Sequence, residues 1–150
     1  MNLFGMIDSS GSAMQAERMR AEVVTANMAN AETTRTQAGV PYRRQHVVFA
    51  AGAGDQSFAG QLSGQLALPG PASAARGVHI AAVVEDTAAP LKRYDPSHPD
   101  ADSEGYVSYP DINPLTEMVD LMGATRAYGL NASAVQAEKS MIASALEIAK

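Results

Sequence analysis

Residues 95–111 carry carboxylate side chains at alternating positions, a spacing that could hold a hard cation. Asp100, Asp102 and Glu104 occupy the first, third and fifth positions of a possible calcium-binding loop. Asp111 falls at the twelfth position, where the last ligand closes an EF-hand loop. Oxygen atoms at this spacing converge on one Ca²⁺ ion, so this segment is the first candidate for chemistry in the chain.

Three features of the same segment favour a solvated acidic turn instead. Pro96 and Pro99 stand where a helix should enter the loop, and proline breaks a helix interior. Glu104 takes a position where Asp or Asn is usual, and Asp111 is shorter than the closing glutamate of an EF-hand. A calcium-binding regulator is therefore a minor alternative, and we predict no metal site.

No other arrangement of residues indicates catalysis or cofactor binding. The chain has 3 His and no Cys, and His46, His79 and His98 lack a recognisable metal-ligand spacing. The sequence contains neither a G-x-S-x-G nucleophile elbow nor a glycine-rich nucleotide motif. We therefore predict that the protein is not an enzyme, needs no cofactor and takes no small-molecule substrate.

Charge and hydropathy narrow the classes of partner. The 150 residues include 11 Lys and Arg against 16 Asp and Glu, a net charge of −5, which argues against nucleic acid. No apolar run is long enough to span a bilayer, and the first residues lack the basic region of a secretory signal. We expect a chain that is not membrane-inserted and has no cleavable signal peptide. Tyr42, Arg43 and Arg44 form a small basic cluster that could meet an acidic partner surface.

The elements that position these residues begin with a helix predicted from about Ser9 to Asn30. The stretch contains no proline, and the serines at its start are candidate N-caps. Apolar residues recur at helical spacing along one side, which we expect to pack against a partner: Met14, Ala21, Val24 and Met28.

The middle of the chain predicts short strands. Residues 45–49, 78–84 and 105–109 are rich in β-branched and aromatic side chains and are bounded by turn residues. Between the first two strands, residues 50–77 consist largely of Ala, Gly, Ser and Gln. That composition predicts a flexible insertion.

The C-terminal segment, 114–150, contains no proline after its first residue and follows a heptad pattern. Asn113 and Pro114 supply an N-cap and a first-turn proline. A helix of this length is a rod of about 50 Å. The heptad positions that we expect to pack are Met118, Leu121, Tyr128, Val135, Ile142 and Leu146.

Together these elements predict an α+β fold with three segments. Two terminal helices, 1–35 and 114–150, would pair as a coiled-coil-like bundle, and residues 36–113 would form a small β-rich module with flexible loops. The seam of such a pair is rich in small residues and buries little apolar area, so an isolated pair would be marginal. This architecture favours assembly with further copies.

Two blocks of sequence resemble a known family. Ala26-Asn27-Met28-Ala29-Asn30-Ala31, followed by Val40-Pro41-Tyr42-Arg43-Arg44, is similar to the N-terminal signature of the axial rod and hook proteins of the bacterial flagellum. A second block and the C-terminal helix resemble the proximal-rod subunits of that family. The residues of the second block that carry the resemblance are Tyr94, Asp95, Pro96, His98, Pro99, Asp100, Gly105, Tyr106 and Val107.

The resemblance implies a structural subunit that leaves the cytoplasm through the flagellar type III export apparatus. It would then polymerise with itself and other rod subunits into the drive shaft that crosses the periplasm in the basal body. Asn27 and Asn30 are either ordinary polar helix residues or donors to the backbone of a neighbouring subunit. A secreted coiled-coil adaptor of another assembly is the alternative function, although it leaves the second block unexplained.

Overall fold

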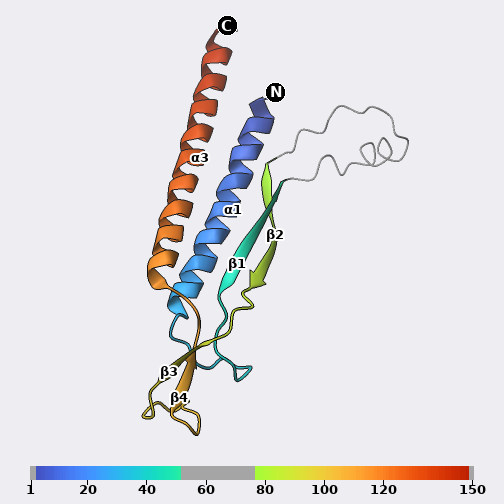
Figure 1. The fold of residues 1–150 in the computed structure, drawn as a ribbon. Coiled ribbons are helices and arrows are strands. Elements are labelled where there is room, and N and C mark those ends of the chain that lie inside the picture. The colour runs from blue at the N-terminus through green and yellow to red at the C-terminus, as the bar shows by residue number, and fades with distance from the viewer. Residues whose placement is uncertain (1–2, 52–76, 149–150) are drawn as a thin grey trace, which may run out of the picture. The chain divides into compact units, whose positions relative to one another are not determined.

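The computed structural model describes residues 3–51 and 77–148, and these contain two helices and four strands (Figure 1). The fold is α+β, as predicted. The predicted insertion, 50–77, lies almost entirely outside the described residues. In chain order the elements are α1 (Leu3–Ala29), β1 (Gln45–Ala51), β2 (Val78–Glu85), β3 (Leu91–Tyr94), β4 (Tyr106–Tyr109) and α3 (Pro114–Ile148).

Helix α1 begins at Leu3, six residues before the predicted start at Ser9. The serines that we interpreted as N-caps lie inside the helix. Ser12 Oγ donates to the backbone oxygen of Ser9 at 2.8 Å, the local bond by which a serine is accommodated in a helix interior. The same hydroxyl accepts the N–H of Val78 at 3.0 Å, so it also ties the start of β2 to α1.

Helix α3 begins where the sequence predicts. Asn113 Oδ1 accepts the N–H of Leu115 at 3.0 Å, and the Asn113 carbonyl accepts the N–H of Glu117 at 3.1 Å. Pro114 occupies the first helical position, where its missing N–H costs nothing. The predicted cap is therefore confirmed.

The strands form two separate two-stranded sheets, β1 with β2 and β3 with β4. The three strands predicted from sequence correspond to β1, β2 and β4. Strand β3 was not predicted, because Leu-Lys-Arg-Tyr has no alternation of apolar and polar residues. It forms by antiparallel pairing with β4, in a register that places Leu91 opposite Tyr109 and Tyr94 opposite Tyr106.

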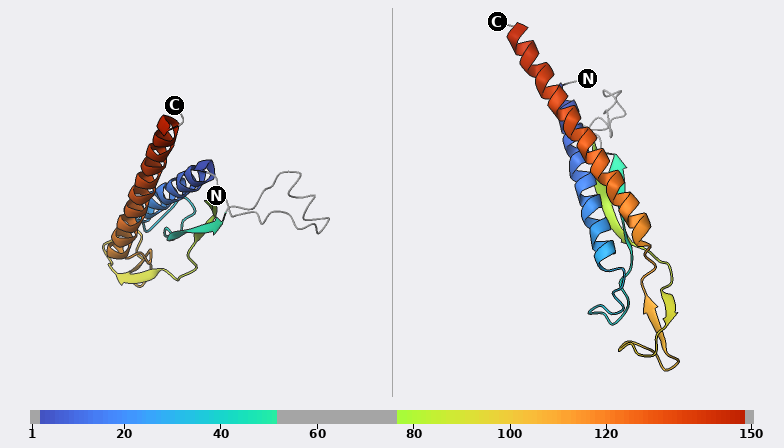
Figure 2. Two further views of the ribbon diagram at one scale, coloured as in Figure 1. Left: turned by 90° about the horizontal axis from the view of Figure 1, so that it is seen from above. Right: turned by 90° about the vertical axis from the view of Figure 1, so that its left-hand side faces the viewer.

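The chain divides into two compact units. The first consists of Met1–Glu17, Phe49–Ala81 and Arg126–Lys150, and the second of Arg18–Val48 and Ala82–Thr125. In the second unit, the end of α1 runs beside the start of α3, as both Figure 1 and Figure 2 show. Among residues 5–51 and 77–148, buried apolar side chains are few: Ala16 in the first unit, and Val24, Val107, Ile112 and Ala124 in the second.

The buried positions of α3 do not coincide with the predicted heptad positions. The predicted positions Met118 and Leu146 are 51% and 64% exposed, whereas Glu117, Ala124 and Glu138 are buried. Leu121, Val135 and Ile142 are half-buried. Near the start of α3 the buried position is therefore Glu117 and not the predicted Met118. No helix among residues 3–51 and 77–148 has the length and apolar character to cross a membrane.

Candidate interaction surface

Asn27, near the end of α1, is the centre of a buried polar network in the second unit. Its side chain is 1% exposed. The amide nitrogen donates to the Gln45 carbonyl at 2.9 Å and to Glu117 Oε2 at 3.1 Å. The amide oxygen accepts the Gln45 N–H at 2.9 Å and the Tyr42 hydroxyl at 3.1 Å. All four hydrogen-bonding positions of this amide are used within the chain.

Glu117 continues the network from the first turn of α3. Its side chain is also 1% exposed, and Arg44 holds the carboxylate with two nitrogens, Nε at 2.6 Å and Nη2. Asp120 lies one turn further and pairs with Arg44 at 3.6 Å and with Arg20 of α1 at 3.1 Å. A buried carboxylate needs such partners, because removing a charge from water costs several kcal/mol.

Tyr42 closes the network at the start of β1. Burial, and after it the negative charges of Glu85 and Glu117, raise the pKa of Tyr42 above its usual 10.0. The phenol therefore keeps its proton and donates to Asn27 at any physiological pH. Residues 42–45 are thereby fixed against both helices of this unit.

The predicted motif residues 94–107 form the connection between β3 and β4. Asp95 Oδ1 accepts the N–H of Ser97 at 3.2 Å and its hydroxyl at 2.7 Å. Asp102 Oδ1 accepts the N–H groups of Glu104 and Tyr106, both at 2.9 Å. These bonds are the main reason that the pKa values of both aspartates are lowered.

Gly105 is required by the shape of this connection. Its φ is 81°, in the left-handed region, and a Cβ there would meet Tyr94 Cε2 at 2.9 Å. The Tyr94 and Tyr106 rings lie edge to face with centroids 5.4 Å apart. The aspartates of this loop therefore hold a turn. Residues 3–51 and 77–148 contain no group of three or more His, Cys, Asp or Glu side chains placed to bind a metal ion.

Asp100 joins the motif loop to the segment that follows α1. Its Oδ2 accepts the Thr34 hydroxyl at 2.8 Å, and its Oδ1 lies 3.5 Å from Arg35 Nη1. The Thr34 bond is the largest cause of the lowered pKa of Asp100. His98 Nδ1 accepts the Asp100 N–H at 3.1 Å, which keeps the turn closed. The segment that follows α1 and the loop between β3 and β4, which no sequence pattern connects, are thus held together.

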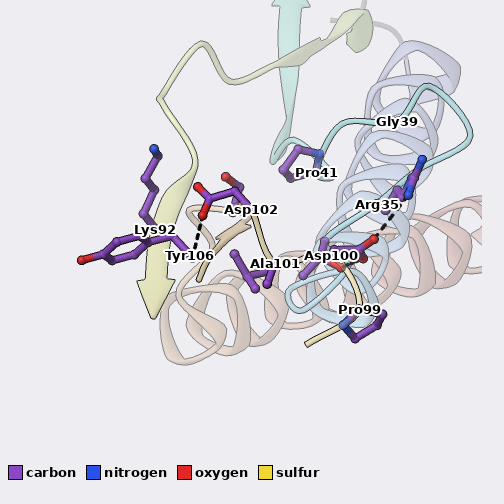
Figure 3. A pocket seen from close by; sticks show the side chains of 12 residues that line it. Arg35, Gly39, Pro41, Lys92, Pro99, Asp100, Ala101, Asp102 and Tyr106 are labelled. Atoms are coloured by element: carbon purple, nitrogen blue, oxygen red, sulfur yellow. Dashed lines mark hydrogen bonds and ion pairs between the residues drawn. The ribbon is translucent and has the colours of Figure 1, made fainter. Parts of the chain in front are cut away.

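A cavity of about 370 Å³ lies between these two segments, as Figure 3 shows. The segment after α1 contributes Arg35, Gly39 and Pro41 to its wall, and the hairpin contributes Lys92, Asp100, Asp102 and Tyr106. Its lining is mostly polar. Such a lining differs from that of an enclosed small-molecule site, which is mainly apolar.

Large apolar side chains lie exposed along α3. Leu115 is 70% exposed, Met122 62% and Leu130 66%. A contiguous patch of exposed apolar side chains typically marks contact with another protein. The large apolar residues of α3 that lie exposed are Leu115, Met118, Val119, Met122, Tyr128, Leu130, Met141, Leu146 and Ile148.

The predicted packing residues fall into two groups. Met118, Tyr128 and Leu146 are exposed and available to another chain. Val24 and Asn27 are buried, and the others are half-buried within the chain: Met14, Ala21, Met28, Asn30, Leu121, Val135 and Ile142.

Of the two roles considered for Asn27, the structure favours the one within its own chain, because all four hydrogen-bonding positions of its amide are used there. Asn30 bonds locally: it donates to the Ala26 carbonyl at 2.9 Å and accepts the Thr33 hydroxyl at 3.2 Å.

Sequence reasoning missed Glu117 and the roles of Tyr42 and Arg44. We interpreted Arg44 as part of a basic cluster for an acidic partner, and its partner is Glu117 of the same chain. The two residues lie 73 positions apart, so no local pattern could pair them. The only signal available was a glutamate in the first turn of an apolar helix, which the helix dipole alone would explain.

Comparison with known proteins gives the family. A family model described as "Flagella basal body rod protein" matches residues 7–36, and one described as "Flagellar basal body rod FlgEFG protein C-terminal" matches residues 103–148. The chain is 41% identical to the flagellar basal-body rod protein FlgC of Bacillus subtilis over 154 residues, covering 100% of both chains. It is 39% identical to FlgC of Borreliella burgdorferi and 34% identical to FlgC of Salmonella typhimurium, each alignment covering 99% of this chain and 98% of the relative. The chain therefore belongs to the FlgC family of flagellar basal-body rod proteins.

Proposed function

We propose that this protein is a structural subunit of the proximal rod in the flagellar basal body. It polymerises with itself and with other rod subunits into the shaft that crosses the periplasm and transmits torque. The observation that carries the proposal is the row of exposed apolar side chains on α3 of a chain that belongs to this family. A monomer leaves that area in water, and contact with neighbouring helices would bury it.

The terminal segments, 1–35 and 114–150, would form the inner part of the shaft by coiled-coil-like packing between subunits, with residues 36–113 outside. Met118, Tyr128 and Leu146 would lie in those contacts. The buried network around Asn27 supports this role, because a shaft under torque needs subunits whose helices keep a fixed register. The protein would act without catalysis and without a cofactor.

A subunit of a rod that crosses the periplasm must first be exported from the cytoplasm. We propose that the chain passes through the flagellar type III export apparatus without a cleaved signal peptide. The few buried apolar residues of the described chain suit such a route, since little burial must be undone before passage.

An in-frame deletion of the gene, with hooks and filaments counted by electron microscopy, tests the proposal. Loss of both, restored by the intact gene, is the expected result. Complementation with Leu130→Asp should fail, because it places a charge on the exposed apolar side of α3. Gln136→Asp is the matched control, since Gln136 is exposed and polar on the same helix. Normal flagella in the deletion strain would favour the adaptor alternative.

A further inference from the structure

We propose that the cavity between the segment after α1 and the β3–β4 hairpin receives an acidic side chain from a neighbouring subunit. This inference rests on the proposed function, because it assumes that copies of the chain or its relatives lie side by side. The cavity is hereafter called the Arg35–Lys92 cavity, after the two cationic residues in its wall.

The two carboxylates of the cavity are each engaged through one oxygen by hydrogen bonds within the chain. Asp100 accepts the Thr34 hydroxyl at 2.8 Å and lies 3.5 Å from Arg35 Nη1. Asp102 accepts two backbone N–H groups at 2.9 Å. Asp100 Oδ2 and Asp102 Oδ1 are thus engaged within the chain, and the charges of the two carboxylates are partly balanced by chain dipoles and by Arg35 and Lys92.

The two cations are not engaged to the same degree. Arg35 has five N–H donors, is 69% exposed at its side chain, and makes one long contact of 3.5 Å to Asp100. The Lys92 side chain is exposed, and no hydrogen bond or ion pair joins its ammonium group to another described residue, although its charge helps to lower the pKa of Asp102. The formal charges of the cavity wall cancel, but Arg35 and Lys92 keep N–H donors that no described acceptor uses. The group that binds in the cavity is therefore a hydrogen-bond acceptor.

A carboxylate is the acceptor that fits best. It accepts several hydrogen bonds at once and carries the charge that two cations favour. The wall is held in place before binding by Pro41, by the turn at Gly105 and by the Asp100–Thr34 bond, so little ordering is lost on contact. The chain itself has a net charge of −5, and copies of it therefore offer carboxylates in excess.

Charge reversal tests the inference. The purified Lys92→Glu variant should match the wild type in circular dichroism and melting, because Lys92 is exposed. Arg35→Glu should keep the wild-type circular dichroism and melt slightly lower, because it loses the contact with Asp100. In the deletion strain each should reduce incorporation into basal bodies about tenfold or more, since opposed like charges cost at least about 1.4 kcal/mol. Lys92→Arg should assemble normally. Arg43→Glu is the matched control, an exposed reversal in the same unit outside this cavity.

A zero-length carbodiimide coupling on isolated basal bodies supplies a second readout that does not depend on a disruptive variant. Lys92 should form an isopeptide bond to an Asp or Glu of another subunit, identified by mass spectrometry, and Lys92→Arg should lose that bond. Incorporation within twofold of wild type for both reversals, an equal loss for Arg43→Glu, or coupling of Lys92 only within its own chain would overturn the inference. Deletion that abolishes flagella, combined with any of these outcomes, would leave the proposed function standing.

Discussion

Asn27 and Glu117, 90 positions apart in sequence, share a hydrogen bond of 3.1 Å between two side chains that are each 1% exposed. Their other partners lie in residues 42–45, at and just before the start of β1. Asn27 bonds to Tyr42 and Gln45, and Glu117 bonds to Arg44. A buried network in which every member is paired specifies one arrangement, because any slip leaves an unpaired polar group. The end of α1 and the start of α3 are thus locked in register by polar contacts.

Asn27→Ala should lower the free energy of unfolding by about 2–4 kcal/mol, because it removes four hydrogen bonds and leaves buried partners unpaired. Asn30→Ala is the control. Asn30 has the same chemistry three residues later but bonds only within residues 26–33, so its loss should cost about 1 kcal/mol or less. Urea denaturation of the purified chain compares them. Equal losses would mean that the network adds nothing beyond a local cap.

A double-mutant cycle should reveal strong coupling between Arg44 and Glu117. Arg44→Met should destabilise the chain by about 3–5 kcal/mol, because Glu117 then keeps a buried charge without its main partner. Glu117→Gln in the Arg44→Met background should recover part of that loss, so the two changes should be non-additive by more than about 1 kcal/mol. Additive effects in equilibrium unfolding would contradict the pairing.

Glu138 should behave in the opposite way to Glu117. Both are buried glutamates of α3, but among the described residues Glu138 has one distant donor, Ser10 Oγ at 3.5 Å, and its Oε2 has no hydrogen-bond partner there. Glu138→Gln should therefore raise the free energy of unfolding by about 1–2 kcal/mol, whereas Glu117→Gln should lower it. Thermal melts of the two variants make the comparison. A loss of stability in both would show that Glu138 is already well compensated.

The sequence predicted the elements that form because their apolar residues recur at a regular spacing. Both helices and three of the four strands follow from spacing, and the cap at Asn113 follows from the chemistry of a helix start. The phase of α3 could not be predicted in this way. The heptad pattern predicts that Met118 is buried because it is apolar. Instead Glu117 is buried, because it bonds to Arg44 and Asn27.

The Arg35–Lys92 cavity was beyond sequence reasoning for the same reason. Asp100 was identified as a motif residue, yet its bond to Thr34 spans 66 positions. Strand β3 also depends on a distant pairing, since Tyr94 and Tyr106 come together only when the turn at Gly105 closes. Local patterns predict elements, whereas contacts between distant polar groups decide how the elements meet.

Gly105→Ala should destabilise the β3–β4 hairpin. Alanine is strained at a φ of 81°, and its Cβ would also press on the Tyr94 ring and on Pro96 at 3.3 Å. We expect a loss of about 1–3 kcal/mol. Gly39→Ala isolates the backbone component, because Gly39 has a φ of 76° with nothing within 4 Å of the added Cβ. Amide hydrogen exchange at residues 91–94 should rise more for Gly105→Ala, and equal increases would contradict the steric argument.

The aspartates of the hairpin loop should make the free energy of unfolding depend on pH in the acid range. Backbone N–H bonds, chiefly from Tyr106, hold the pKa of Asp102 below its usual 3.8, and hydrogen bonds from Ser97 do the same for Asp95. A lowered folded pKa means that the unfolded chain binds protons first as pH falls. The stabilisation is therefore complete above about pH 5 and is lost progressively below pH 4 as the folded groups protonate.

Asp102→Asn tests this dependence, because an amide oxygen can still accept both N–H groups but cannot titrate. Unfolding free energies measured between pH 7 and pH 3 should fall less steeply for Asp102→Asn than for the wild type. Asp102→Ala, which loses the acceptor as well, should be destabilised at pH 7 and should also show the weaker acid dependence. An unchanged slope in both variants would assign the acid sensitivity to other carboxylates and would contradict the role given to Asp102 in this turn.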